Sequence, residues 1–275
     1  MLNHVGSIRP LKIKFKRMET TIKERLKNNE AVHGCWISMG STVTSEIIGS
    51  AGFDWVIIDL EHGVGSEPSL MYQLQALEGM ETTPIIRVES MEIARVKRAL
   101  DMGASGIMFP QIQNAEEASI AISNMYYPPK GRRGLAKMIR ATNYGTDFEK
   151  YFDHSKNNLI GVIQIETLES LKHLDAIAAI DGVDVLFLGP TDLSLALGIL
   201  GQWDHPDFIQ TVESIGRAAG KAGKAAGVLF FDVNQYDFYY QRGFRFLASG
   251  SDMAFINEGA NKRAKEMEAR RNKYQ

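Results

Sequence analysis

Several polar side chains stand at or just after the ends of apolar, strand-like segments, where they could meet in one site. They are Asp59, Glu61, His62, Arg87, Gln164, Glu166 and Asp192. Glu166 and Asp192, with substrate oxygens and water, would form a hard octahedral oxygen shell, which favours Mg²⁺ or Mn²⁺ over zinc. The alternative interpretation of two carboxylates alone is a structural ion pair with an arginine.

Arg87, His62 and Gln164 could act on a substrate beside that pair. A guanidinium in such a position is always charged and needs an anion, either a partner carboxylate or an oxyanion that develops on a substrate. His62 could be a hydrogen-bonded structural residue or, with Asp101 orienting its ring, a proton shuttle near neutral pH. Gln164 lies two residues before Glu166 and so shares its face of a strand.

Eight apolar runs of strand length must carry these side chains. They span residues 32–39, 55–61, 83–89, 106–112, 159–166, 184–189, 225–231 and 244–249. Their hydrophobicity is continuous rather than alternating, which is typical of parallel strands covered on both faces. Segments 67–79 and 91–103 lie between runs and place apolar residues at helical spacing.

Eight strand–helix units in about 250 residues predict an α/β fold, a (β/α)₈ TIM barrel that forms a single domain. The loops at the carboxyl ends of its strands converge on one pocket, so the polar side chains would meet there. An open doubly wound sheet is the alternative. It would normally show a phosphate-binding glycine fingerprint after the first strand, which residues 38–46 do not supply.

The two ends of the chain differ from the middle. Residues 1–17 are basic and contain no acid, which predicts a flexible extension, with an organelle presequence as the weaker alternative. The barrel is predicted over 18–260, and 261–275 as the polar end of a helix or a tail. The connection 126–158 is too long for a plain loop, so we expect either a packed excursion or a lid or subunit contact bordering the site.

Composition limits the partners. The chain has 31 Lys and Arg against 33 Asp and Glu, a net charge of −2, so no overall basic field exists to hold nucleic acid or an anionic membrane. No apolar stretch approaches the roughly 18 residues that a membrane span requires. The single cysteine, Cys35, is expected to be a buried hydrophobe and points to a reducing, cytoplasmic location.

Six ordered motifs resemble those of the HpcH/HpaI aldolase family, a family of class II, metal-dependent, pyruvate-specific aldolases of the phosphoenolpyruvate/pyruvate-binding barrel superfamily. They are GFDWVIIDLEHG (52–63), PIIRVES (84–90), ALDMGASGIMFPQIQNAEEA (99–118), YYPPKGRRG (126–134), GVIQIET (161–167) and GVDVLFLGPTDLSLALG (182–198). The resemblance runs from about Met18 to Asn257 and implies reversible cleavage of a 4-hydroxy-2-oxo acid to pyruvate and an aldehyde, through a metal-stabilised enolate.

The resemblance also assigns roles to matching positions. Glu166 and Asp192 fall on the metal ligands, for Mg²⁺ or Mn²⁺ with Co²⁺ as a further candidate, and Arg87 falls on the arginine that stabilises the enolate. His62 falls on the catalytic histidine, paired with Asp101. The residues implied to contact pyruvate are Arg87, Gln164 and the segment Gly189, Pro190, Thr191 and Asp192. A homo-oligomer is implied, a hexamer or trimer of dimers whose last helix, here near 252–270, can be exchanged between subunits.

The sequence leaves other functions as alternatives. A Schiff-base aldolase needs a desolvated lysine at a strand end, and QIET, LGPTD, LFFDV and LASG contain none. A CoA-ester lyase resembling the citrate lyase β subunit is a second enzyme class, although EHG and YPPKGRRG argue against it. A non-catalytic barrel that binds a 2-oxo acid is the third alternative.

The sequence does not identify the aldehyde half of the substrate. Four basic residues could meet a distal carboxylate of the substrate or could line a subunit contact. They are Arg132, Arg133, Lys137 and Arg140. The sequence does not choose between these roles, and it does not fix the metal or the oligomer size.

Overall fold

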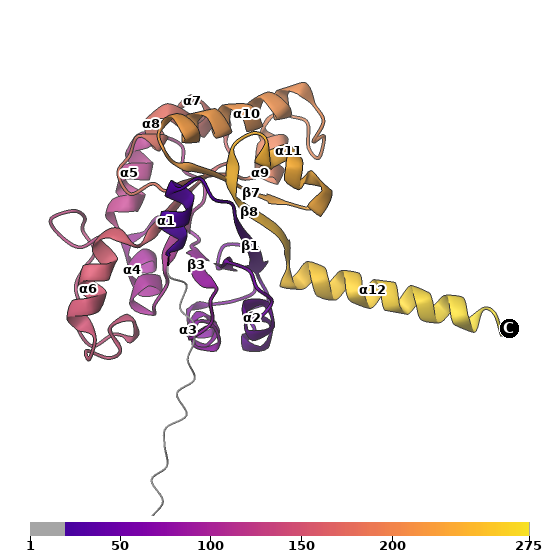
Figure 1. Cartoon of the computed structure of the whole chain (residues 1–275), viewed down its shortest axis with the longest axis horizontal. Coiled ribbons are helices and arrows are strands. Elements are labelled where there is room, and N and C mark those ends of the chain that lie inside the picture. The colour runs from indigo at the N-terminus through magenta and orange to yellow at the C-terminus, as the bar shows by residue number, and fades with distance from the viewer. Residues whose placement is uncertain (1–19, 275) are drawn as a thin grey trace, which may run out of the picture.

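A closed barrel of eight parallel strands forms the centre of the molecule (Figure 1). The computed structural model describes residues 20–274, so the predicted extension 1–17 lies outside the described residues. The strands are β1 (Val32–Ile37), β2 (Trp55–Asp59), β3 (Thr83–Arg87), β4 (Gly106–Phe109), β5 (Ile160–Ile165), β6 (Val185–Leu188), β7 (Ala225–Phe230) and β8 (Phe244–Ser251). Each pairs with its neighbour in the sequence, and β8 closes on β1. The predicted TIM barrel and all eight predicted strands are confirmed.

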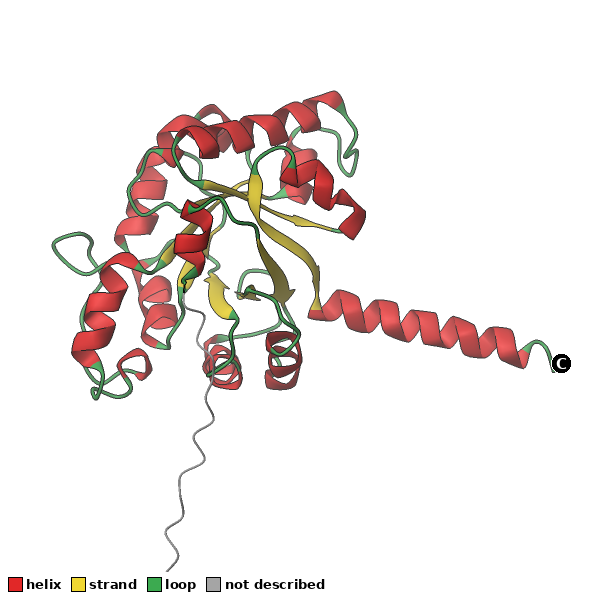
Figure 2. Ribbon diagram, viewed as in Figure 1, coloured by secondary structure: helices red, strands yellow, loops and turns green. Residues whose placement is uncertain are grey.

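Helices surround the barrel on its outer side (Figure 2). They are α1 (Ile22–Lys27), α2 (Thr42–Gly49), α3 (Glu67–Ala76), α4 (Ile93–Asp101), α5 (Ala115–Ser123), α6 (Phe148–Asn157), α7 (Leu168–Lys172), α8 (Leu174–Ala178), α9 (Pro190–Ala196), α10 (Pro206–Lys221), α11 (Tyr236–Tyr240) and α12 (Asp252–Arg271), with 3₁₀ turns η1 (Arg140–Thr142) and η2 (Val233–Gln235). Among the described residues, no helix has the combination of length and apolarity needed to cross a membrane.

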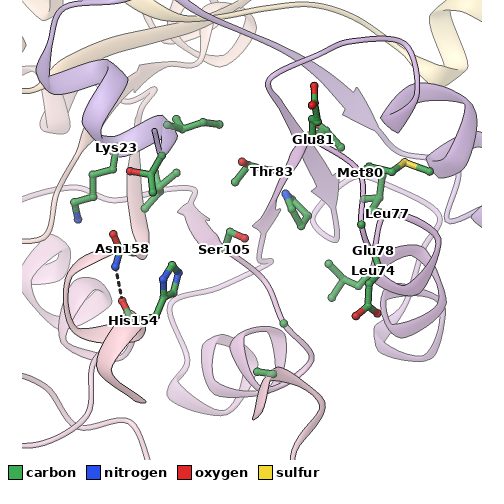
Figure 3. A pocket seen from close by; sticks show the side chains of 18 of the residues that line it. Lys23, Leu74, Leu77, Glu78, Met80, Glu81, Thr83, Ser105, His154 and Asn158 are labelled. Carbon is green, nitrogen blue, oxygen red and sulfur yellow. Dashed lines mark hydrogen bonds between the residues drawn. The ribbon is translucent and has the colours of Figure 1, made fainter. Parts of the chain in front are cut away.

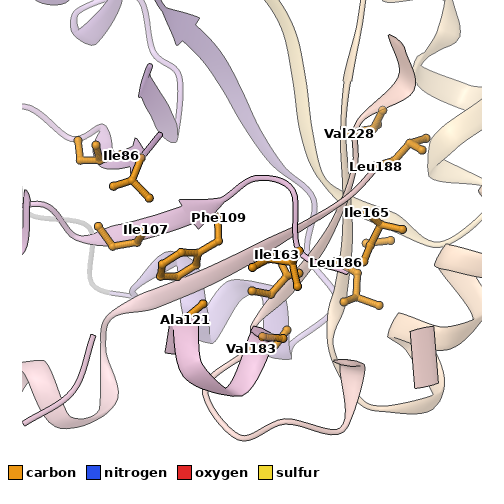
Figure 4. Close-up of a cluster of buried hydrophobic side chains, with 14 of the residues drawn as sticks. Ile86, Ile107, Phe109, Ala121, Ile163, Ile165, Val183, Leu186, Leu188 and Val228 are labelled. Atoms are coloured by element: carbon orange, nitrogen blue, oxygen red, sulfur yellow. The ribbon is translucent and has the colours of Figure 1, made fainter. Parts of the chain in front are cut away.

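Two hydrophobic layers explain the continuous apolar runs. On β5, Val162 belongs to the cluster inside the barrel, whereas Ile163 and Ile165 belong to the cluster between the strands and the helices (Figure 4). Gln164 and Glu166 alternate with these outward residues, so they share the inward face as predicted. Both are buried, which places the polar groups at the carboxyl end of the barrel interior.

Aromatic rings fill the barrel interior below that site. The Trp55 ring stacks on Phe246 with centroids 3.7 Å apart, and Trp36 packs against Phe187. A β-carbon on Gly34 would lie 2.2 Å from the Trp55 ring, so only glycine leaves room for the indole. This packed interior gives the mouth residues a rigid floor.

The long connection 126–158 joins α5 to β5 and therefore lies at the amino-terminal ends of the strands. Arg133 is fully buried within it, pairs with Asp101 at 2.6 Å and lies over the Tyr127 ring. These contacts support a packed excursion. Within one chain the connection does not border the carboxyl-end site, so it is not a lid on that site.

Helix α12 projects away from the barrel as a single straight rod (Figure 1). It runs without a break across the predicted boundary between 260 and 261. Four of its apolar side chains are exposed, namely Met253, Phe255, Ile256 and Met267. A helix with this exposure gains almost no stability from packing on its own chain.

Candidate active site

A cavity of about 370 Å³ opens at the carboxyl-terminal end of the barrel. Seven of the predicted site residues line it: His62, Arg87, Gln164, Gly189, Pro190, Thr191 and Asp192. Strands β2, β3, β5 and β6 bring them together, because each residue lies in or directly after one of these strands. The rest of the wall consists of Trp36, Ser38, Phe187, Leu229, Phe231 and Ser251.

Glu166 is buried as deeply as Asp59, each with 3% of its surface exposed. Its Oε1 accepts a 2.6 Å hydrogen bond from the Gln111 amide, and its Oε2 accepts one of 2.8 Å from the Gln164 side chain. The pKa of Glu166 is raised to about 7: burial is the largest cause, the negative charges of Glu61 and Asp192 add to it, and the Gln111 amide and Arg87 oppose it. The positive charge near Glu166 therefore does not fully balance the negative charge of its carboxylate.

Gln111 was not identified from the sequence. Its φ of +58° lies in the left-handed region, which a non-glycine residue adopts only when its surroundings hold it there. The hydrogen bond that its amide donates to Glu166 stabilises that conformation. No local sequence signal predicts such a backbone donor.

Gly189 gives Glu166 the space that it occupies. A β-carbon at this position would lie 2.8 Å from Oε2 of Glu166 and 2.9 Å from its Cβ. The backbone φ of Gly189 is −88°, so the residue is needed here for close approach and not for an unusual conformation. Gly189 therefore brings the start of α9, which carries Asp192, directly against the Glu166 carboxylate.

Arg87 is held from the side by two acids. Its Nε and Nη2 donate to Asp59 at 2.9 and 2.7 Å, a bidentate pair, and its Nη1 lies 3.0 Å from Glu61. Asp59 and Arg87 are register partners on β2 and β3, which fixes this geometry. The sequence located both acids at a strand end but gave them no role. Asp59 and Glu61 hold the guanidinium at the mouth of the barrel.

His62 reaches the same cavity but is held loosely. Its side chain is 72% exposed, and its Nε2 lies 3.8 Å from Glu61, too far for a hydrogen bond. Asp101, the expected orienting partner, is the last residue of α4, which runs back toward the amino-terminal ends of the strands. There it pairs with Arg133. The structure does not bring His62 and Asp101 together within one chain.

Gln164 leaves one polar atom free inside the site. Its side-chain nitrogen donates to Glu166, and its Oε1 is buried without a hydrogen-bond partner in the described structure. A buried acceptor in this state costs free energy unless a ligand or water satisfies it. Gln164 is thus suited to contact a bound molecule.

A second cavity of about 410 Å³ lies at the opposite, amino-terminal end of the barrel (Figure 3). Two of its cationic side chains already form ion pairs, Lys23 with Asp184 and Arg140 with Glu78. Arg140, Arg132, Arg133 and Lys137 all belong to this end through the connection 126–158, so they do not meet a substrate in the cavity of their own chain.

The chain is also similar to known proteins. The family described as HpcH/HpaI aldolase/citrate lyase matches residues 33–258. A protein named 5-keto-4-deoxy-D-glucarate aldolase, from Salmonella arizonae, is 39% identical over 231 residues, which cover 84% of this chain and 90% of that protein.

Two solved structures are also similar. An HpcH/HpaI aldolase/citrate lyase family protein from Burkholderia cenocepacia has a TM-score of 0.85 at 32% identity, covering 90% of this chain and 98% of that chain. An HpcH/HpaI aldolase from Desulfitobacterium hafniense has a TM-score of 0.82 at 28% identity, covering 90% and 96%.

Proposed function

Because the chain belongs to the HpcH/HpaI aldolase/citrate lyase family, we propose that it is a class II aldolase that reversibly cleaves a 4-hydroxy-2-oxo acid to pyruvate and an aldehyde. The chain is a carbon–carbon lyase. One observation carries the specific proposal: Arg87, Gln164 and Asp192 line one cavity whose wall at Gly189 is pressed against Glu166.

The residues of the site fit a divalent cation. Aldolases of this class depend in general on a divalent metal. Glu166 and Asp192 would hold the cation, since two neighbouring carboxylates repel each other and burial already raises the pKa of Glu166. Oxygen ligands favour Mg²⁺ or Mn²⁺, with Co²⁺ as a further candidate. When bound, such a cation supplies Lewis-acid polarisation of the 2-oxo group.

The start of α9 would hold the pyruvate carboxylate. Thr191 and Asp192 lie in the first turn of that helix, where amides have no partner within the helix, while Pro190 has no N–H to donate. The Gly189 amide is already bonded to Ile165. Thr191 and Asp192 are therefore the amides suited to an anion at this point.

Arg87 and His62 would act on the two ends of the breaking bond. His62 accepts the proton of the 4-hydroxyl group, the C4–O bond gains double-bond character, and the C3–C4 electrons move onto C3, C2 and the 2-oxo oxygen. The guanidinium of Arg87 stabilises the pyruvate enolate that results, where the negative charge develops. Protonation of the enolate at C3 by solvent completes pyruvate, His62 returns its proton to solvent, and condensation is the same sequence reversed.

The substrate class follows from the named relative. We propose a 4-deoxy-5-oxo aldarate, of the type named for the Salmonella protein, which would leave pyruvate and a three-carbon aldehyde acid. Within one chain the cavity offers no second arginine for the distal carboxylate among its described lining residues. A neighbouring copy would have to supply such a group.

We propose that the enzyme is a homo-oligomer in which α12 packs on a neighbouring copy. The exposed apolar residues Phe255 and Ile256 on a projecting helix support this arrangement. Any part that Asp101 takes in orienting His62 would also require a neighbouring copy. We place the enzyme in the cytoplasm, in keeping with the buried, unpaired thiol of Cys35.

A panel of 4-hydroxy-2-oxo acids, assayed for pyruvate release through lactate dehydrogenase, tests the proposal. We expect turnover that EDTA abolishes and that Mn²⁺ or Mg²⁺ restores. An acyl-CoA panel run in parallel tests the CoA-ester lyase alternative. Pyruvate binding without release from any member of the panel would leave only a non-catalytic barrel.

A further inference from the structure

Asp252, the first residue of α12, is a buried carboxylate with no place in the chemistry described above. It is 2% exposed and accepts four hydrogen bonds. The donors are the Ser38 amide (2.9 Å), the Met39 amide (3.2 Å), the Thr44 hydroxyl (2.9 Å) and its neighbour Met253 (2.9 Å). Three of them belong to the segment that follows β1 and begins α2. Asp252 therefore connects the first turn of α12 to that segment through hydrogen bonds.

The segment after β1 in turn holds the loop that carries His62. The carbonyl oxygen of Ser38 accepts a 2.9 Å hydrogen bond from the Val64 amide. The two backbones also approach each other closely beyond this hydrogen bond, where a β-carbon on Gly40 would lie 2.8 Å from Cα of Gly65. A displacement of the Ser38 peptide would thus move residues 62–65 with it.

The side chain of His62 has little else to fix it. It is 72% exposed, and its nearest charged neighbour, Glu61, is 3.8 Å away. On its inner side the His62 amide donates to Asp59 at 3.2 Å. The backbone of the loop, held by Asp59 from within and by Ser38 from without, therefore sets the position of the imidazole in the cavity.

We propose that Asp252 is a positioning residue for His62, acting through the Ser38 peptide and the Val64 amide. This inference rests on the proposed function, in which His62 moves the proton of the 4-hydroxyl group. A carboxylate suits the position because each oxygen accepts two of the four donors. An asparagine NH₂ group cannot accept from a backbone amide, so it would lose both hydrogen bonds if it faced Ser38 and Met253, and the one from Met39 if it faced Met39 and the Thr44 hydroxyl.

A double-mutant cycle between Asp252 and His62 tests the inference. Wild type, Asp252→Asn, His62→Ala and the double variant are assayed for kcat and KM of pyruvate release at saturating Mn²⁺. We expect Asp252→Asn to lower kcat about tenfold or more in the native background, with KM changed less than twofold, and to lower it less than twofold in the His62→Ala background. An equal loss in both backgrounds, or no loss in the native one, would overturn the inference.

A second pair of variants breaks the same connection without touching Asp252. Val64→Pro removes the amide that donates to Ser38, and Val64→Ala keeps it; the valine side chain is 74% exposed, so neither change disturbs the core. We expect Val64→Pro to reproduce the His62-dependent loss of kcat and Val64→Ala to stay within twofold of wild type. If circular dichroism shows that Asp252→Asn does not fold, the two Val64 variants test the inference in its place. Equal activities for Val64→Pro and Val64→Ala would contradict the inference.

The same assay separates this inference from the proposed function. If wild type releases no pyruvate from any 4-hydroxy-2-oxo acid, both fail. If wild type turns over but the cycle is additive, the aldolase assignment stands and only the role of Asp252 falls.

Discussion

At the scale of single residues, the site is a concentration of negative charge around one guanidinium. Asp59, Glu61, Glu166 and Asp192 gather near Arg87, and Arg87 is already paired with the first two. Glu166 and Asp192 are left as the acids whose charge a cation would balance. The sequence led us to predict this pair as metal ligands from position alone, without knowing that Asp59 and Glu61 pair with the arginine.

The raised pKa of Glu166 predicts how pH acts on the metal-free protein. The folded state holds this proton up to a pKa of about 7, whereas the unfolded chain releases it near about 4.3. The contribution of Glu166 to stability is therefore full below about 4.3 and is lost as the pH rises through about 7. As the pH is increased from 5 to 8 in EDTA, we expect the Tm of wild type to decrease relative to the Tm of Glu166→Gln.

Glu116→Gln, which changes an exposed glutamate, serves as the control, and its difference from wild type should stay flat over this pH range. A flat difference for Glu166→Gln as well would show that the folded protein does not hold the extra proton.

Arg87→Ala tests the enolate-stabilising charge. Removing one preorganised charge at a developing oxyanion typically costs about 10²–10³ in rate, so we expect kcat to fall by that factor or more. Asp59 also loses its bidentate partner, and breaking a buried pair costs about 3–5 kcal/mol, so the free energy of unfolding should fall as well. Steady-state kinetics and urea unfolding measure the two effects. Near-native kcat in a folded variant would remove Arg87 from the mechanism.

At the scale of elements, the strands decide which side chains meet. Periodicity was sufficient to place Gln164 and Glu166 on one face and to locate all eight strands, because burial on both sides leaves a continuous apolar run. It could not give the pairing of Asp59 with Arg87, which depends on the register between two strands 28 positions apart. Nor could it show which partner Asp101 takes, since a helix returns its last residue to the opposite end of the barrel.

The junction of β6 and α9 gives a prediction at this scale. Gly189→Ala places a methyl group 2.8 Å from the Glu166 carboxylate, so we expect Mn²⁺ affinity to fall about 10–100-fold, as for other changes that displace a ligand. Isothermal titration calorimetry measures the affinity. Gly220→Ala in α10 is the matched control, because its β-carbon meets nothing within 4 Å, and it should bind Mn²⁺ normally. Unchanged affinity in Gly189→Ala would contradict the close approach of α9 to Glu166.

At the scale of the whole molecule, most of α12 does not pack against the rest of its own chain. Asp252 attaches the first turn of the helix to the barrel, whereas Phe255 and Ile256 further along it are exposed. Apolar side chains on a solvent-exposed helix favour association with another copy that can bury them.

We therefore expect the full chain to elute as a multiple of 30.6 kDa in light-scattering chromatography. A Phe255→Ser, Ile256→Ser double variant should shift it toward a lower mass, and Lys262→Ala, a polar change on the same helix, should leave the mass unchanged. A wild-type chain that elutes at 30.6 kDa would rule out exchange of α12.

The central claim is that Glu166 and Asp192 hold one divalent cation against which pyruvate binds. Electron paramagnetic resonance of Mn²⁺ measures this directly. We predict that wild type binds one Mn²⁺ per chain, that pyruvate alters its spectrum, and that Glu166→Gln and Asp192→Asn each lower the affinity at least tenfold. Equal Mn²⁺ binding by wild type and both variants, or a spectrum that pyruvate leaves unchanged, would contradict it.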